Sequence, residues 1–378
     1  MDKFIFNENE MSSENETLNG ALPRLRNFEE VEAEKIKEKL MELESFRITT
    51  KTEVPPEEPT VTVDGIGVFA KRDIHAVKAK QKQGKTTIMK VILAVMFIRE
   101  LFRLKSPLKD PKVLWLDTEQ KQSDVKLVLT DVQYLTNLPD DYIDEHICLY
   151  HLRKRTYKTL NDDLTLLVKT HHPDVVFIDG VVEFVDSFND ETFSRETIQK
   201  LMILAEEENC AIINVLHENK SADDDNMRGH LGTMLAQAAG TVVECKKSNK
   251  GIITVASTDP RHAPMPSWSV KFDSDGHIVD ADALYRQEQL LKKEEQNERR
   301  QAKKEERNRE RKDAAVQIVR NNGGSMLRKD LKQELKAKLK LGDSSVQEII
   351  RVCLESELKM VNGRICLLPS ESQNEPTT

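Results

Sequence analysis

Long apolar runs, paired cysteines and aromatic residues are all scarce in this chain of 378 residues. No apolar stretch approaches the roughly 18 residues that a membrane-spanning helix needs. The acidic N-terminus lacks the basic and apolar segments of a secretory signal. The five cysteines are scattered, without the spacings of a disulfide scaffold or a structural zinc site. We therefore expect a cytoplasmic protein that makes no contact with a membrane.

Charge is abundant but unevenly distributed. Residues 1–60 hold 8 Lys and Arg against 15 Asp and Glu, whereas residues 286–370 hold 21 against 14. A basic C-terminal region predicts that any contact with nucleic acid lies at that end of the chain. The overall pI near 5.7 argues against a protein that coats nucleic acid along its whole length.

The residue pattern predicts an α/β core followed by a small second domain. Between 61 and 280, short β-branched runs alternate with amphipathic helices, which is typical of a mostly parallel sheet covered on both faces. Three predicted helices (313–322, 325–339 and 346–359, the last capped by Ser344-Ser345) and a hairpin turning at Asn362-Gly363 indicate a C-terminal winged helix. The expected parts are an acidic segment with one helix (27–46) and a proline-rich linker (1–60), the α/β domain (61–280), a charged, partly helical linker (281–312), the winged helix (313–370) and a disordered tail (371–378).

A phosphate-binding motif occupies residues 79–87, between a predicted strand (74–78) and a predicted helix (86–104). It fits the Walker A pattern with Ala79 in place of the first glycine. Gly84 lets the backbone wrap around phosphates, Lys85 reaches the terminal phosphates, and Thr86 supplies a hydroxyl to Mg²⁺. The motif predicts that ATP and Mg²⁺ bind here. The predicted binding residues are Ala79, Lys80, Gln81, Lys82, Gln83, Gly84, Lys85, Thr86 and Thr87.

Acidic and polar residues end three of the later apolar runs. Asp179 ends the run 174–179, where a carboxylate would orient the magnesium shell together with Thr86. Glu119 follows the run 113–117 and is the candidate to polarise the attacking water, with Asp117 as its competitor. His217 ends the run 211–217, although a lone histidine at the end of a strand is more often structural.

These runs resemble those of RecA-like ATPases. In that group the catalytic glutamate lies in a run like I-D-A-E, and L-D-T-E here puts Glu119 in that place. AAA+ enzymes instead carry the glutamate beside the Walker B aspartate, where this chain has Gly180. Residues 62–275, through the runs DTEQ, FIDG, LHENK and RGHLGT, resemble the RepA-like branch of bacterial plasmids and mobilisable elements. The resemblance implies a RecA fold, hydrolysis of ATP at subunit interfaces, ring or filament assembly, and a γ-phosphate sensor at His217.

In an interface of that kind the neighbouring subunit supplies an arginine or lysine finger, a positively charged side chain that stabilises the transferred phosphoryl group. The favoured candidate is Arg261, and Lys246, Lys247 and Arg228 are alternatives. Partition ATPases of the ParA type carry a lysine at the position of Lys80, but the glycines that flank it there are absent here.

The leading hypothesis is an oligomeric RecA-like ATPase of a bacterial mobile element that acts on DNA in replication or mobilisation. DNA would contact the winged helix and the basic C-terminal region. Acidic residues after the strands, such as Glu183, Asp186 and Asp190, argue against a processive helicase. The alternatives are a non-motor, ATP-switched DNA-binding regulator, a winged helix that binds protein, and a metabolic P-loop kinase.

Overall fold

The computed structural model describes residues 28–218, 227–258 and 264–368. The chain divides into two units, Met1–Pro56 and Glu57–Thr378. The first unit contains α1 (Phe28–Ser45), the charged helix predicted over 27–46. Among the described helices, none combines the length and the apolar character that crossing a membrane requires.

A nine-stranded sheet forms the centre of the second unit. Its strand order is β13-β12-β11-β10-β3-β9-β8-β6-β7. The six strands from β10 to β7 are parallel, as predicted, and the other three extend the sheet in antiparallel pairing. The parallel strands are β3 (Asp73–Ala79), β6 (Val113–Asp117), β7 (Ile147–His151), β8 (Val175–Asp179), β9 (Ala211–His217) and β10 (Thr241–Lys247). The antiparallel strands are β11 (Ile253–Thr258), β12 (Trp268–Phe272) and β13 (Ile278–Asp280), of which β12 and β13 were not predicted.

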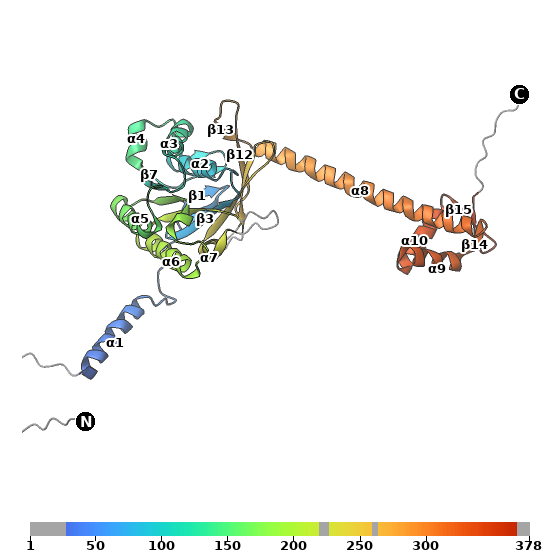
Figure 1. Cartoon of the computed structure of the whole chain (residues 1–378), viewed down its shortest axis with the longest axis horizontal. Helices are drawn as coiled ribbons and strands as arrows, with labels where there is room; N and C mark the ends of the chain where they lie inside the picture. The colour runs from blue at the N-terminus through green and yellow to red at the C-terminus, as the bar shows by residue number, and fades with distance from the viewer. Residues whose placement is uncertain (1–27, 219–226, 259–263, 369–378) are drawn as a thin grey trace, which may run out of the picture. The chain divides into compact units, whose positions relative to one another are not determined.

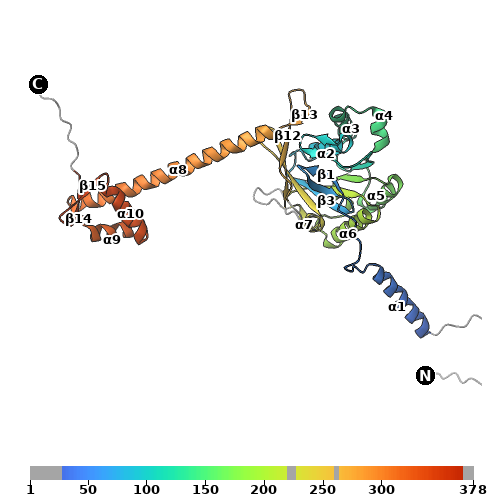
Figure 2. The same ribbon diagram turned by 180° about the vertical axis from the view of Figure 1, so that it is seen from behind.

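Helices cover both faces of this sheet (Figure 1). One hydrophobic core lies between the sheet and α2, α3 and α4, and a second lies between the sheet and α5, α6 and α7. Figure 2 shows the same layers from behind. Because both faces are buried, the central strands are almost continuously apolar. The helices are α2 (Lys85–Ile98), α3 (Gln122–Thr136), α4 (Asp140–His146), α5 (Tyr157–His171), the short 3-10 helix η1 (Val181–Phe184), α6 (Glu191–Glu207) and α7 (Gly229–Ala238).

A second sheet has four strands in the order β2-β1-β5-β4. Because the chain enters this sheet, the helix after the phosphate loop is shorter than predicted. The helix predicted over 86–104 ends at Ile98, because Arg99 adopts a left-handed conformation and the chain turns into the β4–β5 hairpin. The strands of this sheet are β1 (Pro59–Val63), β2 (Ile66–Ala70), β4 (Glu100–Leu101) and β5 (Leu104–Lys105).

A single helix of 40 residues, α8 (Asp282–Asn321), replaces the predicted linker and the first helix of the C-terminal domain. It runs without a break through the boundary expected at 312–313 (Figure 1). No glycine or proline interrupts this segment, and Lys, Arg, Glu and Gln are good helix formers. The prediction of a partly helical linker was therefore too conservative.

The C-terminal end of α8 packs with two further helices and a three-stranded antiparallel sheet ordered β14-β16-β15. The predicted hairpin at Asn362-Gly363 is confirmed. The second helix starts later than predicted because residues 325–327 pair with β16, and Ser344 and Ser345 lie inside the third helix rather than capping it. These elements are β14 (Ser325–Leu327), α9 (Arg328–Leu339), α10 (Asp343–Leu354), β15 (Leu358–Val361) and β16 (Arg364–Leu367).

Candidate nucleotide-binding site

The phosphate motif forms a tight loop between β3 and α2. β3 ends at Ala79 and α2 begins at Lys85, with Gly84 as a left-handed N-cap that makes no side-chain capping bond. A side chain at Gly84 would come within 2.6 Å of Ile253. The first N–H groups of a helix lack intrahelical partners, so they are available to phosphate oxygens. The loop therefore has the geometry that its sequence predicts.

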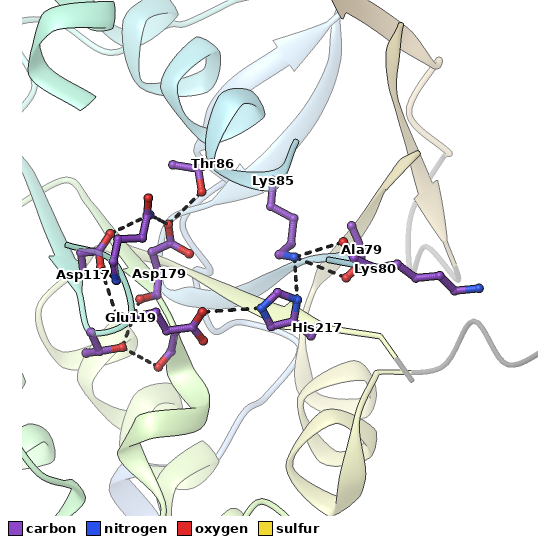
Figure 3. Close-up of polar contacts among 11 residues, drawn as sticks. Ala79, Lys80, Lys85, Thr86, Asp117, Glu119, Asp179 and His217 are labelled. Atoms are coloured by element: carbon purple, nitrogen blue, oxygen red, sulfur yellow. Dashed lines mark hydrogen bonds and ion pairs between the residues drawn. The ribbon is translucent and has the colours of Figure 1, made fainter. Parts of the chain in front are cut away.

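Lys85 points into the loop and is only 8% exposed (Figure 3). Its Nζ donates to the carbonyl oxygens of Ala79 at 3.4 Å and Lys80 at 3.5 Å, and it lies 2.9 Å from Nδ1 of His217. Burial lowers the pKa of Lys85, while nearby acidic groups, led by Asp179, oppose that shift. The ammonium group is thus partly desolvated and held where a terminal phosphate would attract it.

Thr86 and Asp179 form the predicted metal-binding pair. The Thr86 hydroxyl donates to Oδ2 of Asp179 at 3.0 Å. Burial raises the pKa of Asp179 to about 7, and the charges of Asp117 and Glu119 add to that increase. Among the described residues no ion pair neutralises this buried carboxylate. A buried carboxylate beside a hydroxyl fits Mg²⁺, which prefers oxygen ligands. These two residues would hold the ion.

Asp117, the competitor for the catalytic role, is fully buried and engaged in local bonds. It accepts hydrogen bonds from the backbone N–H groups of Glu119 at 3.1 Å and Gln120 at 2.8 Å. The Gln120 side chain donates to both Asp117 and Asp179 at 2.8 Å. Sequence reasoning missed Gln120, although it directly follows the acidic run. Because Asp117 positions this turn, Glu119 is the better candidate for catalysis.

Gly180 explains why no acid stands beside Asp179. Its φ is +105°, and a Cβ there would lie 2.3 Å from the Thr118 hydroxyl oxygen. That hydroxyl donates to the carbonyl oxygens of Asp179 and Gly180 at 3.1 and 2.9 Å. The turn after β8 therefore requires glycine, and any catalytic carboxylate would have to come from a neighbouring strand.

His217 joins the phosphate loop to the candidate catalytic carboxylate. Its Nε2 lies 3.5 Å from Oε2 of Glu119, while its Nδ1 faces Lys85 (Figure 3). The lysine ammonium can only donate, so Nδ1 accepts and the imidazole proton of neutral His217 lies on Nε2, toward Glu119. This hydrogen bond lowers the pKa of Glu119. The strand order brings these residues together, because β9 lies between β3 and β8.

These residues line one cavity of about 570 Å³ with two chemically different ends. Glu119, Gln120, Asp179 and His217 come from the β9, β8 and β6 side of the phosphate loop. The opposite end is formed by Lys247, Ile253 and Phe272, from β10, β11 and β12. Phe272 is 41% exposed, which is high for an aromatic side chain. Sequence reasoning missed Ile253 and Phe272, because they lie far from the motif in the chain.

The candidate fingers lie in different settings. Arg261, the favoured one, falls outside the described residues, so its role stays a prediction. Lys246 pairs with Glu244 at 2.7 Å, and the Arg228 guanidinium lies 4.2 Å from the centre of the Phe188 ring. Lys247 belongs to the wall of the cavity in its own subunit.

A family model described as an AAA domain matches residues 38–223, a range that includes the phosphate loop, Glu119, Asp179 and His217. This part of the chain is therefore similar to that family of AAA domains. No curated protein matches the chain. The crystal structure of the RadB recombinase is similar at 16% sequence identity and a TM-score of 0.43, over 57% of this chain and 93% of that one.

Proposed function

We propose that the ATPase domain binds ATP with Mg²⁺ and hydrolyses it. The observation that carries this proposal is that two sets of polar contacts line one cavity. The Thr86–Asp179 pair lines this cavity, and so does the series of contacts from Lys85 through His217 to Glu119. The Thr86–Asp179 pair fits a metal ion. The second set, which runs from Lys85 to Glu119, fits a terminal phosphate and an attacking water.

Each residue then has a defined task. The N–H groups at the start of α2 and the Lys85 ammonium bind the β- and γ-phosphates. Thr86 and Asp179 hold Mg²⁺, which when bound neutralises charge on the phosphates. Glu119 orients the attacking water and accepts its proton. His217 contacts both Lys85 and Glu119, so it is placed to respond when Lys85 moves toward a phosphate.

The apolar end of the cavity suits the nucleobase. A triphosphate that reaches Glu119 with its terminal group extends its other end toward β10, β11 and β12. Phe272 offers an exposed apolar ring there beside the buried Ile253, and aromatic rings stack on bases. In this proposal Phe272 stacks on the adenine.

The first experiment measures ATP binding and hydrolysis by the wild-type chain and by Lys85→Ala. We expect both to be lost in the variant, because the phosphate loop loses its only buried ammonium. Lys90→Ala is the matched control, since Lys90 lies on the same helix and pairs with Asp131 outside the cavity. Hydrolysis that survives Lys85→Ala would contradict the assignment of the site.

The wider role is also a proposal: an oligomeric ATPase of a bacterial mobile element that acts on DNA in replication or mobilisation, with helicase-like or loader-like activity. It rests on the resemblance to RepA-like ATPases and on the basic C-terminal region, whose arrangement of helices and hairpin suits a winged helix. The oligomer is tested by mixing inactive Lys85→Ala chains with Arg261→Ala chains. Activity that reappears in the mixture means that one subunit supplies a residue to its neighbour's site.

A non-motor regulator is the second candidate. It is favoured by the acidic character of the segment after β8, where Asp190 caps α6 by accepting from the N–H of Phe193. An acidic segment offers little affinity for phosphates. Hydrolysis that DNA stimulates, together with strand separation, would favour the motor. ATP-dependent binding to one duplex sequence without unwinding would favour the regulator.

A further inference from the structure

The middle of α8 contributes no side chain to a hydrophobic core of the described structure. Between Glu288 and Ala314 none of its residues is buried. The residues of this segment are charged or polar on every side of the helix. A helix of that composition usually depends on ion pairs between residues four apart. Such pairs occur near its start, where Lys292 contacts Glu288 at 2.8 Å. Among the described residues, the seven Lys and Arg residues from 299 to 311 make no ion pair.

The charges of this segment are sorted onto two sides of the helix. At 100° per residue, six basic side chains fall within an arc of about 140°, and most of the acidic ones fall on the opposite side. Arg309 and Lys312, which fall on the acidic side, and Glu310, which falls on the basic side, are the exceptions. The basic face consists of Arg299, Arg300, Lys303, Lys304, Arg307 and Arg311. The acidic face consists of Glu294, Glu295, Glu298, Glu305 and Glu306.

This separation of basic and acidic residues destabilises the isolated helix. Arg299, Lys303, Arg307 and Arg311 follow one another at intervals of four residues. Each like-charged pair at that spacing costs roughly 0.2–0.5 kcal/mol, whereas alternating signs would stabilise the helix by a similar amount. A polyanion bound along the basic face would remove this repulsion.

The C-terminal unit provides a contrast. On α10, the helix that would read bases in a winged helix, the only cation is Arg351, and it pairs with Glu348 at 2.6 Å and Glu355 at 3.4 Å. On α9, Lys332 and Lys336 both contact Asp343. These three cations already pair with carboxylates. On the basic face of α8 all six cations lack an ion pair among the described residues, and all except the partly buried Arg311 are fully exposed.

We propose that the basic face of α8 binds the phosphate backbone of duplex nucleic acid without reading its sequence. Arg299 and Arg311 are about 18 Å apart along the axis at 1.5 Å per residue. Duplex DNA carries one charge per about 1.7 Å of its axis, so a straight basic ridge of this length meets several phosphates. An anionic membrane fits less well, because a helix that lies on a membrane needs an apolar face, and Ala302 is the only apolar residue from 292 to 313. The inference rests on the proposed DNA partner, not on ATP hydrolysis.

The test is the affinity of the full-length chain for a short fluorescent duplex, measured by anisotropy over a series of salt concentrations. The variant Arg299→Gln/Lys303→Gln/Arg307→Gln keeps good helix formers and removes three charges from the basic face. We expect its affinity to fall at least about tenfold at low salt and its salt slope to fall by about 2–3, because each lost phosphate contact contributes about 0.9.

The matched control is Glu294→Gln/Glu298→Gln/Glu305→Gln, which removes three charges from the opposite face of the same helix. It should bind the duplex as tightly as the wild type or more tightly, and circular dichroism should show that both variants keep their helix content. Two duplexes of unrelated sequence should bind alike.

Three results would overturn the inference. Unchanged duplex binding by the basic-face variant would mean that DNA contacts another part of the chain. The proposal that DNA is a partner would still stand. Binding of the wild type to acidic vesicles but not to a duplex would assign the face to a membrane. An absence of duplex binding by the wild type would remove the DNA partner as well, while Lys85-dependent hydrolysis would still support the ATPase proposal.

Discussion

The phosphate site and the helix α8 use charged residues in opposite ways. In the site, Lys85 and Asp179 are buried, and each is held by a few contacts from neighbouring strands. On α8, the basic side chains from Arg299 to Arg309 are exposed and make no ion pair with any described residue. The two proposals therefore use charge in different ways, one by exact placement in a desolvated pocket and one by the summed field of many solvated groups.

The comparison has a measurable consequence. A buried charge is poorly screened and depends on its position, so a single substitution should have a large effect that salt hardly changes. An exposed charge is screened, so a single substitution should have a small effect that grows as salt is removed.

The largest expected effect comes from Glu119→Gln. The amide cannot accept the proton of the attacking water, so hydrolysis should fall about 10²–10⁴-fold while ATP still binds. Single-turnover hydrolysis and binding of a fluorescent ATP analogue separate the two effects. Loss of binding together with hydrolysis would show instead that Glu119 holds the loop together.

The next effect is the pH dependence of metal binding. Because the pKa of Asp179 is raised to about 7, the carboxyl is mostly protonated below that pH. Mg²⁺ must displace this proton, so its apparent affinity in the presence of ATP should fall up to about tenfold per pH unit below 7 and level off above it. Asp179→Asn should bind Mg²⁺ weakly, with only the pH dependence of the nucleotide itself. Identical profiles for both proteins would remove Asp179 from the metal site.

A smaller effect is expected at the apolar end of the cavity. Phe272→Ala should weaken ATP binding between about 5- and 150-fold, because base stacking on an aromatic ring is worth about 1–3 kcal/mol. Inorganic tripolyphosphate, which has no base, should compete equally well for both proteins, and Phe272→Tyr should restore affinity for ATP. An equal loss for both ligands would mean that Phe272 supports the phosphate loop.

The smallest effect is expected from one substitution on α8. Lys303→Gln should reduce duplex affinity only a few-fold at low salt and leave basal ATP hydrolysis unchanged, because one phosphate contact among several is lost. Anisotropy and an ATPase assay on the same preparation check both statements. A large change from this single substitution would point to a specific contact and would end the contrast with the phosphate site.

Much of the α/β core could be predicted because local patterns and burial agree. The apolar runs that became β6, β8 and β9 are buried on both faces, and each ends close to the polar residue that marks the site. The loop from Ala79 to Thr86 follows a strand and opens a helix as its motif requires. Predictions were weaker where tertiary contacts decided the outcome. Residues 325–327 read as the start of a helix, but pairing with β16 makes them a strand.

The amino-acid sequence alone predicted the phosphate loop, its lysine, the two candidate carboxylates and the histidine, because each belongs to a short run whose spacing reflects a local requirement. Such short runs do not determine the order of the strands in the sheet. Only the tertiary structure showed that His217 contacts both Lys85 and Glu119, that Gln120 ties Asp117 to Asp179, and that Phe272 reaches the same cavity. These contacts depend on β9 lying between β3 and β8 and on β12 lying on the other side of the loop. Pairings between distant segments are set by the packing of the whole sheet, which no local pattern encodes.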